Sequence, residues 1–224
     1  MGAFDFIKSE LNDSITPLLE GQTKQPFINE IDMNNTCMSI VERYLNEGLI
    51  DEFAETGLDN RMRIATSFYN EVSEAMGIDA GLNFVPMPYL MEGGYIPSTN
   101  SIELNINSLE RPNCQSLFNT ILHESRHAFQ HKAVDNPDSV SVDNNIIDIW
   151  RQNFDNYIPP WLDYEAYREQ PVEEDAFDYA DNFFLENNND RILAEVKTDK
   201  EACLDENSQE VIIRINEQLD NPIV

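Results

Sequence analysis

The feature that most constrains the fold is a change of hydrophobic period near the middle of the chain. Residues 101–107 alternate apolar and polar side chains, a period of two that is typical of a half-buried strand. Arg111-Pro112-Asn113 interrupts this pattern, and residues 115–132 then follow a helical period. The helix stripe predicted to be buried contains Phe118, Ile121, Leu122, Ser125 and Phe129. The sequence therefore predicts a strand followed closely by a long amphipathic helix.

Helical patterns also occur on both sides of this strand and helix. In the N-terminal part, helices are predicted over residues 3–20, 34–49 and 59–76, followed by a strand over residues 82–86 and a turn at Gly93-Gly94. In the C-terminal part, the prediction comprises short helical pieces around residues 146–154, a helix from Pro171 to about Leu185, and one or two peripheral helices over residues 190–218.

The order of these elements predicts an α+β fold. We expect a small, mostly antiparallel sheet beside the helix over residues 115–132, with further helices flanking both. On this interpretation, residues 1–78 form an N-terminal helical region packed on the core, and residues 79–185 form the core itself. Residues 186–224 are predicted to form a C-terminal helical tail.

The charge and the amino-acid composition limit which partners and locations the protein is expected to have. The formal net charge of −28 disfavours a nucleic-acid role, because such a surface repels phosphate backbones. No segment approaches the roughly 20 apolar residues of a membrane helix, and the first residues lack the pattern of a secretory signal. The cysteines Cys37, Cys114 and Cys203 form no paired motif, which favours a reducing, cytoplasmic location.

All three histidines of the chain, His123, His127 and His131, fall on the predicted helix over residues 115–132. His123 and His127 are one turn apart, about 6 Å along the axis, so both imidazoles can reach one Zn²⁺ ion. Glu124 follows the first histidine and can take a proton from water on the metal. The H-E-x-x-H sequence therefore predicts a zinc site with Glu124 as the general base.

His131 extends the series by a further turn. It lies about 12 Å along the axis from His123, too far to share a metal with it on a straight helix. We therefore expect His131 to cap the C-terminus of the helix rather than to bind the metal.

The third metal ligand is predicted to be a carboxylate, because no other histidine exists. Glu173 is the first candidate, since its helix face is otherwise apolar and a buried carboxylate must be paired or bound to a metal. That face also contains Ala176, Phe177, Ala180 and Phe184. Glu174 remains the alternative ligand, although an ordinary solvated acidic face accounts better for Glu174 and Asp175 than for Glu173.

These motifs resemble the zincin superfamily of metallopeptidases in its Glu-ligand, gluzincin-like form. Over about residues 82–185 the chain looks most like the ImmA/IrrE-like and related small bacterial and phage-borne peptidases. The matching segments are Gly94-Tyr95, Ile102-Glu103-Leu104-Asn105, and residues 123–130 and 173–180. The resemblance implies that residues 79–185 are a catalytic core that hydrolyses peptide or protein substrates.

Two other functions stay open at this point. A zincin-like domain can act as a catalytically silent structural or binding module, as in a phage particle or a regulatory complex, although such a module has no need of Glu124. A DNA-associated, SprT-like peptidase is disfavoured by the acidity of the chain. For the enzyme, the strand over residues 101–107 is a candidate to pair with an extended substrate. Candidates to stabilise an oxyanion are Tyr164, Tyr167, Tyr179 and Arg126.

Overall fold

The structure is a computed structural model, and it describes residues 27–46, 48–88 and 91–185. The helices predicted over residues 3–20 and 190–218, and the whole tail 186–224, lie outside these residues. Within the described part of the chain, no helix combines the length and the apolar composition needed to cross a membrane.

The described elements confirm an α+β fold in which helices predominate. Three helices come first, namely α2 (Glu30–Asn46), α3 (Leu49–Glu55) and α4 (Leu58–Met76). The strands β1 (Gly81–Val85), β2 (Gly93–Ile96) and β3 (Ser101–Asn105) follow, and α5 (Gln115–Asp135) comes next. The last helices are α6 (Asn144–Asp155), α7 (Tyr164–Glu169) and α8 (Pro171–Leu185).

The sheet is mixed, so the prediction of a mostly antiparallel sheet is wrong. Its strand order is β1-β3-β2, with β1 parallel and β2 antiparallel to β3. The short turn at Pro97–Thr99 reverses the chain between β2 and β3, which makes this pair antiparallel. At the end of β3, Asn105 donates hydrogen bonds to the carbonyls of Glu92 and Met91, which precede β2. Strand β2 therefore starts at this end of the sheet on the side of β3 away from β1, and β1 runs parallel to β3.

The position of β3 also corrects the predicted substrate strand. Residues 101–105 lie in the centre of the sheet and pair on both sides, so they have no edge to offer a peptide. Gly93-Gly94, predicted as a turn, instead begins β2, the edge strand. Gly93 is suited to this place because a Cβ atom there would come within 3.0 Å of Thr120 on α5 and 2.9 Å of a β3 carbonyl.

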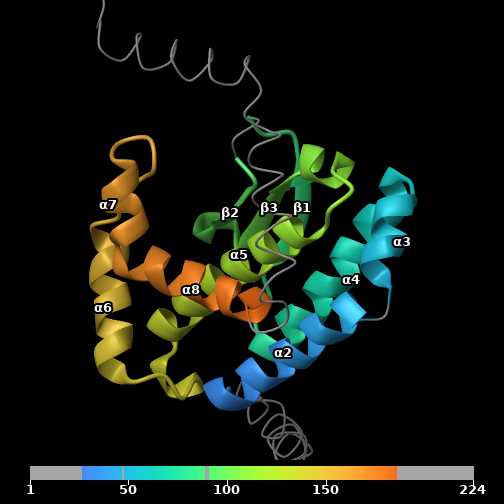
Figure 1. Cartoon of the computed structure of the whole chain (residues 1–224). Helices are drawn as coiled ribbons and strands as arrows, with labels where there is room; N and C mark the ends of the chain where they lie inside the picture. The colour runs from blue at the N-terminus through green and yellow to red at the C-terminus, as the bar shows by residue number, and fades with distance from the viewer. Residues whose placement is uncertain (1–26, 47, 89–90, 186–224) are drawn as a thin grey trace, which may run out of the picture.

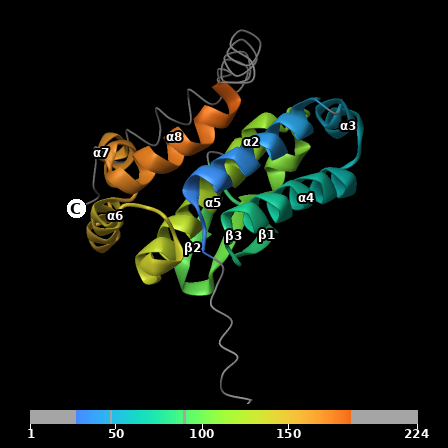
Figure 2. The ribbon, with the colours of Figure 1, turned by 90° about the horizontal axis from the view of Figure 1, so that it is seen from below.

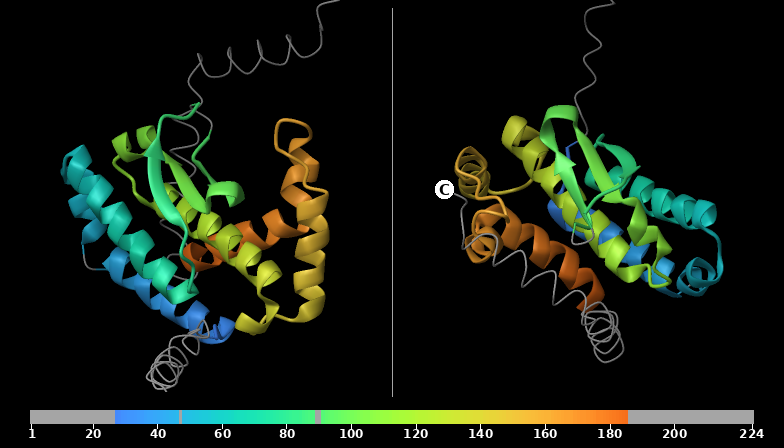
Figure 3. Two further views of the ribbon diagram at one scale, coloured as in Figure 1. Left: turned by 180° about the vertical axis from the view of Figure 1, so that it is seen from behind. Right: turned by 90° about the horizontal axis from the view of Figure 1, so that it is seen from above.

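Helix α5 lies between the sheet and α8 (Figures 1 and 2). Seen from behind, the sheet covers α5, with α4 and α6 on its two sides (Figure 3). All residues from Ile121 to Gln130 are buried, so several faces of the helix are covered at once. The sequence predicts only one buried stripe here, because the remaining faces carry polar side chains.

The start of α8 is held by side chains from the segments before it. Pro171 occupies the first helical position, where a missing N–H costs no hydrogen bond. The Val172 N–H donates to Asn153 Oδ1 on α6 at 2.9 Å. Gln170 bridges to Asn153 and to the backbone of Ile158. These bonds fix the first turn of α8, and with it Glu173, beside α5.

Candidate metal centre

Two side chains of α5 and one of α8 converge on a single point. His123 Nε2 lies 3.1 Å from His127 Nε2 and 3.3 Å from Glu173 Oε2. His127 Nε2 lies 3.4 Å from Glu173 Oε1. Three ligands of a tetrahedral zinc ion, each about 2.1 Å from the metal, stand about 3.4 Å apart. The three side chains are therefore spaced as the ligands of one small metal ion would be.

The burial of this cluster makes its polarity costly without a cation. Glu173 is 1% exposed, and the two histidines are 6% and 9% exposed. Glu173 Oε2 accepts no hydrogen bond within the described structure. Burial raises the pKa of Glu173, but contacts with His123, His127 and Tyr157 outweigh it and hold the pKa well below its usual range. An ionised carboxylate in this position favours a bound positive charge.

The Glu173 carboxylate also changes the pKa of His127. Burial lowers its pKa, but the contact with Glu173 more than offsets this and raises the pKa of His127 to about 9. A metal ion at this point would displace a proton from His127, since a histidine ligand must be deprotonated at the coordinating nitrogen.

Glu124 lies between this cluster and the edge of the sheet. It is buried, and its Oε2 accepts a hydrogen bond from the Tyr95 N–H of β2 at 2.7 Å. One oxygen of Glu124 and one nitrogen each of His123 and His127 lie within 4.8 Å of one another. The buried group His123, Glu124 and His127 could therefore hold a metal ion, and Glu173 approaches the same two imidazoles from α8.

His131 is not among these converging residues. Its ring stacks on Phe154 of α6, with centroids 3.9 Å apart, and lies 5.3 Å from the ring of Tyr95. The predicted capping of the helix C-terminus is wrong, because α5 continues to Asp135 and Asn136 caps it through a bond to the Lys132 carbonyl. His131 is thus a packing residue between α5, α6 and β2.

The alternative ligand Glu174 is exposed on α8, so the structure does not bring it to the histidines. Asp175 was predicted to belong to a solvated acidic face, but it instead accepts two hydrogen bonds from Arg126 at 2.8 and 3.0 Å. Arg126 is buried between these bonds and the rings of Phe129, Trp150 and Tyr179.

Two tyrosines line the side of the cluster next to α7. Tyr157 donates a hydrogen bond to Glu173 Oε1 at 2.6 Å. Burial and the nearby Glu173 carboxylate raise the pKa of both Tyr157 and Tyr167. Of the four predicted oxyanion-stabilising residues, only Tyr167 has this placement. Arg126 and Tyr179 contact each other away from the cluster, and Tyr164 is exposed.

Sequence reasoning did not identify Tyr157 or Glu30 as neighbours of the site. Tyr157 follows α6 in a proline-rich connection, where no periodic pattern fixes its direction. Glu30 lies nearly a hundred positions before its partner Arg126, to which it is bonded at 2.8 Å. A weak signal existed for this second pair, because an arginine next to the predicted buried stripe needs a carboxylate partner.

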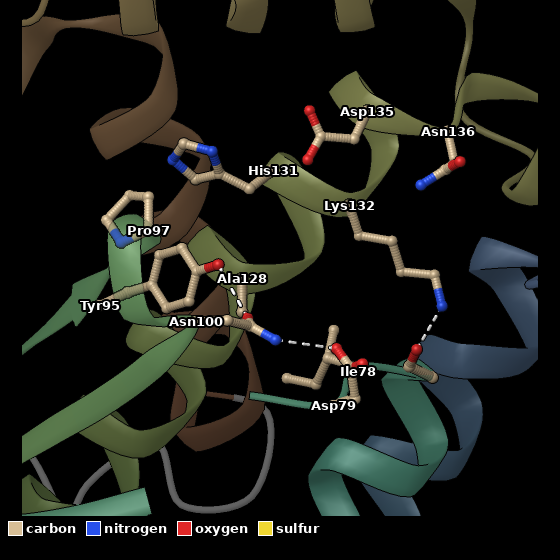
Figure 4. Close-up of a pocket in the computed structure, with 11 residues that line it drawn as sticks. Ile78, Asp79, Tyr95, Pro97, Asn100, Ala128, His131, Lys132, Asp135 and Asn136 are labelled. Atoms are coloured by element: carbon tan, nitrogen blue, oxygen red, sulfur yellow. Dashed lines mark hydrogen bonds between the residues drawn. The ribbon is translucent and has the colours of Figure 1, made fainter. Parts of the chain in front are cut away.

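A pocket of about 480 Å³ opens one turn further along α5 (Figure 4). Tyr95, Ala128 and His131 form the wall nearest the candidate metal centre, and Asp79 and Asp135 contribute carboxylates. The Tyr95 side chain faces this pocket, while the Tyr95 N–H faces Glu124. Strand β2 therefore connects the pocket with the metal centre.

No protein-family model matches the chain, and no curated protein or solved structure is significantly similar to it. The interpretation of the site therefore rests on its geometry and on the H-E-x-x-H motif. The motif contains His123, Glu124 and His127, and the geometry adds Glu173 from another helix.

Proposed function

We propose that the protein is a zinc-dependent peptidase with a zincin-like active site. The observation that carries the proposal is the convergence of His123, His127 and Glu173, whose ligand atoms lie 3.1–3.4 Å apart. Two imidazole nitrogens and one carboxylate oxygen are a ligand set that zinc prefers in catalytic sites. A set of three protein ligands also leaves a coordination position open for a reactant.

The side chain of Glu124 is placed to move a proton. Zn²⁺ held by His123, His127 and Glu173 would supply a Lewis acid, which would lower the pKa of a water molecule toward about 7. Glu124 lies beside the ligands, and no cation contacts its carboxylate among the described interactions. It can accept the proton of the attacking water and deliver it to the leaving nitrogen.

The outer edge of β2 favours a peptide as the substrate. Within the described residues β2 pairs only with β3, and on its outer edge the Tyr95 N–H is bonded to Glu124. An extended peptide can add to the remaining backbone groups of this edge through hydrogen bonds, which would bring its carbonyl to the metal centre. A Cβ atom at Gly94 would meet nothing within 4 Å, so the face of the strand at this residue is open.

Tyr157 and Tyr167 are the proposed donors to the oxygen that becomes negatively charged. Both lie next to Glu173 and on the side of the cluster away from the Arg126 network. A hydroxyl that stays protonated at neutral pH can donate a hydrogen bond to a developing oxyanion.

The proposal is tested by combining metal analysis with a peptidase assay on a library of unstructured peptides. The wild type should contain about one zinc per chain and cleave some of the peptides. Glu124→Gln should retain zinc and melting temperature, while turnover falls by the roughly 10²–10⁴-fold typical of a lost general base. A wild type that binds no zinc, or a Glu124→Gln variant with unchanged turnover, would contradict the proposal. Zinc binding without cleavage of any peptide would favour the binding-module alternative.

A further inference from the structure

We propose that Gln130 and Asp175 are positioning residues that hold His127 in the orientation needed to bind the metal. This inference rests on the proposed zinc site and extends it to the residues behind the ligands. Gln130 is on α5, one turn after His127, and is fully buried, with a relative exposure of 0%. Asp175 is on α8, two positions after Glu173.

The hydrogen bonds of Gln130 fix the direction of its amide. Its Nε2 donates to the Val172 carbonyl at 2.9 Å and to Asp175 Oδ2 at 2.7 Å. Both partners are acceptors only, so the NH₂ group of Gln130 must face them. The amide oxygen, Oε1, then faces His127 Nδ1 at 2.9 Å.

This direction determines the tautomer of His127. An amide oxygen can only accept a hydrogen bond, so Nδ1 of His127 carries a hydrogen and donates it to Gln130. The nitrogen turned toward His123 and Glu173 is then Nε2, which is free to coordinate once its proton leaves. A partner behind a histidine ligand commonly fixes ring orientation and raises ligand basicity. His123 lacks such a partner within the described structure, since its Nδ1 is buried without a hydrogen bond.

Asp175, on α8, holds the Gln130 amide in the direction that bonds His127. Its carboxylate accepts from Gln130 Nε2 and from both the Nε and an Nη of Arg126. Arg126 also bonds Glu30 of α2 at 2.8 Å, so three helices meet at this guanidinium. Because Asp175 and Glu173 belong to the same first turns of α8, one set of bonds sets the orientation of His127 and the place of the third ligand together.

The test compares Gln130→Met with the control Gln115→Met. Both glutamines lie on α5 and both are buried, at 0% and 7% exposure. Gln130 alone contacts a proposed metal ligand. Zinc affinity is measured by competition with a chromophoric chelator, and thermal stability is measured on the metal-free proteins. The absorption spectrum of the Co²⁺-loaded proteins reports ligand geometry.

Gln130→Met should weaken zinc binding by about 10–100-fold and shift the Co²⁺ spectrum, as expected for loss of a partner behind a ligand. Gln115→Met should keep both near wild type even if its melting temperature falls as far. Asp175→Asn should weaken zinc binding by less than Gln130→Met. Equal zinc affinity in wild type and Gln130→Met, or losses in both glutamine variants that only follow stability, would overturn the inference. Absence of zinc binding by the wild type would instead overturn the proposed function.

Discussion

Helices α5 and α8 are joined by two buried polar clusters that differ in one respect. In the first, Arg126 of α5 is bonded to Asp175 of α8 and also to Glu30 of α2. In the second, His123 and His127 of α5 face Glu173 of α8. The first cluster contains its own permanent cation, whereas the second contains only groups that need one.

The two clusters also differ in whether both oxygens of the α8 carboxylate accept hydrogen bonds. Both oxygens of Asp175 accept hydrogen bonds, from the Arg126 guanidinium and the Gln130 amide. Burial alone would lower the pKa of Arg126, but Asp175 and Glu30 outweigh it and raise this pKa. Glu173 is more deeply buried, yet its Oε2 accepts no hydrogen bond in the described structure. A buried carboxylate left in this state is costly in a purely structural contact and is suited to a metal.

The largest expected effect is on the cluster that lacks a cation. His127→Ala should weaken zinc binding by roughly a quarter of the total, about 3–4 kcal/mol or 10²–10³-fold, since four ligands share about 10–16 kcal/mol. His131→Ala, one turn further along α5, should keep one zinc per chain, because its ring packs on Phe154. Metal analysis after dialysis separates the two. Loss of zinc in both variants would show that the ligand set is misassigned.

The second effect sharpens the choice between neighbouring carboxylates on α8. Glu173→Gln should weaken zinc binding by roughly 100-fold, less than His127→Ala, because the amide oxygen can still coordinate while the charge is lost. Glu174→Gln should leave zinc affinity unchanged, because Glu174 is exposed and does not face the histidines. Isothermal titration of the metal-free proteins with zinc measures both. The reverse order of the two variants would make Glu174 the ligand.

The third effect concerns the cluster that has its own cation. Arg126→Met removes a buried charge and leaves two carboxylates without their partner, so the free energy of unfolding should fall. The carboxylates are each 29% exposed, so water reduces the loss to about 2 kcal/mol, below the roughly 3–5 kcal/mol of fully buried pairs. Arg151→Met, which breaks the exposed pair with Asp148, should cost less than about 0.5 kcal/mol. Urea denaturation measures both, and equal losses would refute the contrast.

The same comparison explains what could be predicted from the sequence. Four elements could be predicted from their hydrophobic period or from a proline at the helix start. They are the strand over residues 101–105 and helices α4, α5 and α8. The H-E-x-x-H spacing places His123 and His127 on one side of a helix, and the apolar face around Glu173 indicates its inward direction. These are local properties, which a sequence records directly.

The Arg126 cluster could not be predicted in the same way. Its members come from three helices, and Asp175 stands among other acidic residues with nothing local to distinguish it from Glu174. The strand order of the sheet was missed for a similar reason, because the position of Met91, just before β2, depends on a side-chain bond from Asn105. Pairings between distant segments are decided by packing, which the hydrophobic pattern of each segment does not specify.

The smallest expected effect tests how strongly the metal cluster depends on the Tyr157 hydroxyl. Tyr157 donates a hydrogen bond to Glu173 Oε1 at 2.6 Å, and its ring is partly exposed. Tyr157→Phe removes this bond and keeps the ring, so zinc affinity should fall by about 1 kcal/mol, or roughly fivefold, the usual net contribution of one hydrogen bond. Tyr164→Phe is the matched control, because Tyr164 is exposed on the neighbouring helix and has no described bond to Glu173. If Tyr157 also donates to the oxyanion, Tyr157→Phe should in addition lower kcat measured at saturating zinc, where the loss of zinc affinity has no effect. A variant that loses zinc affinity alone would confine Tyr157 to holding Glu173, and Tyr167 would then be the remaining candidate donor.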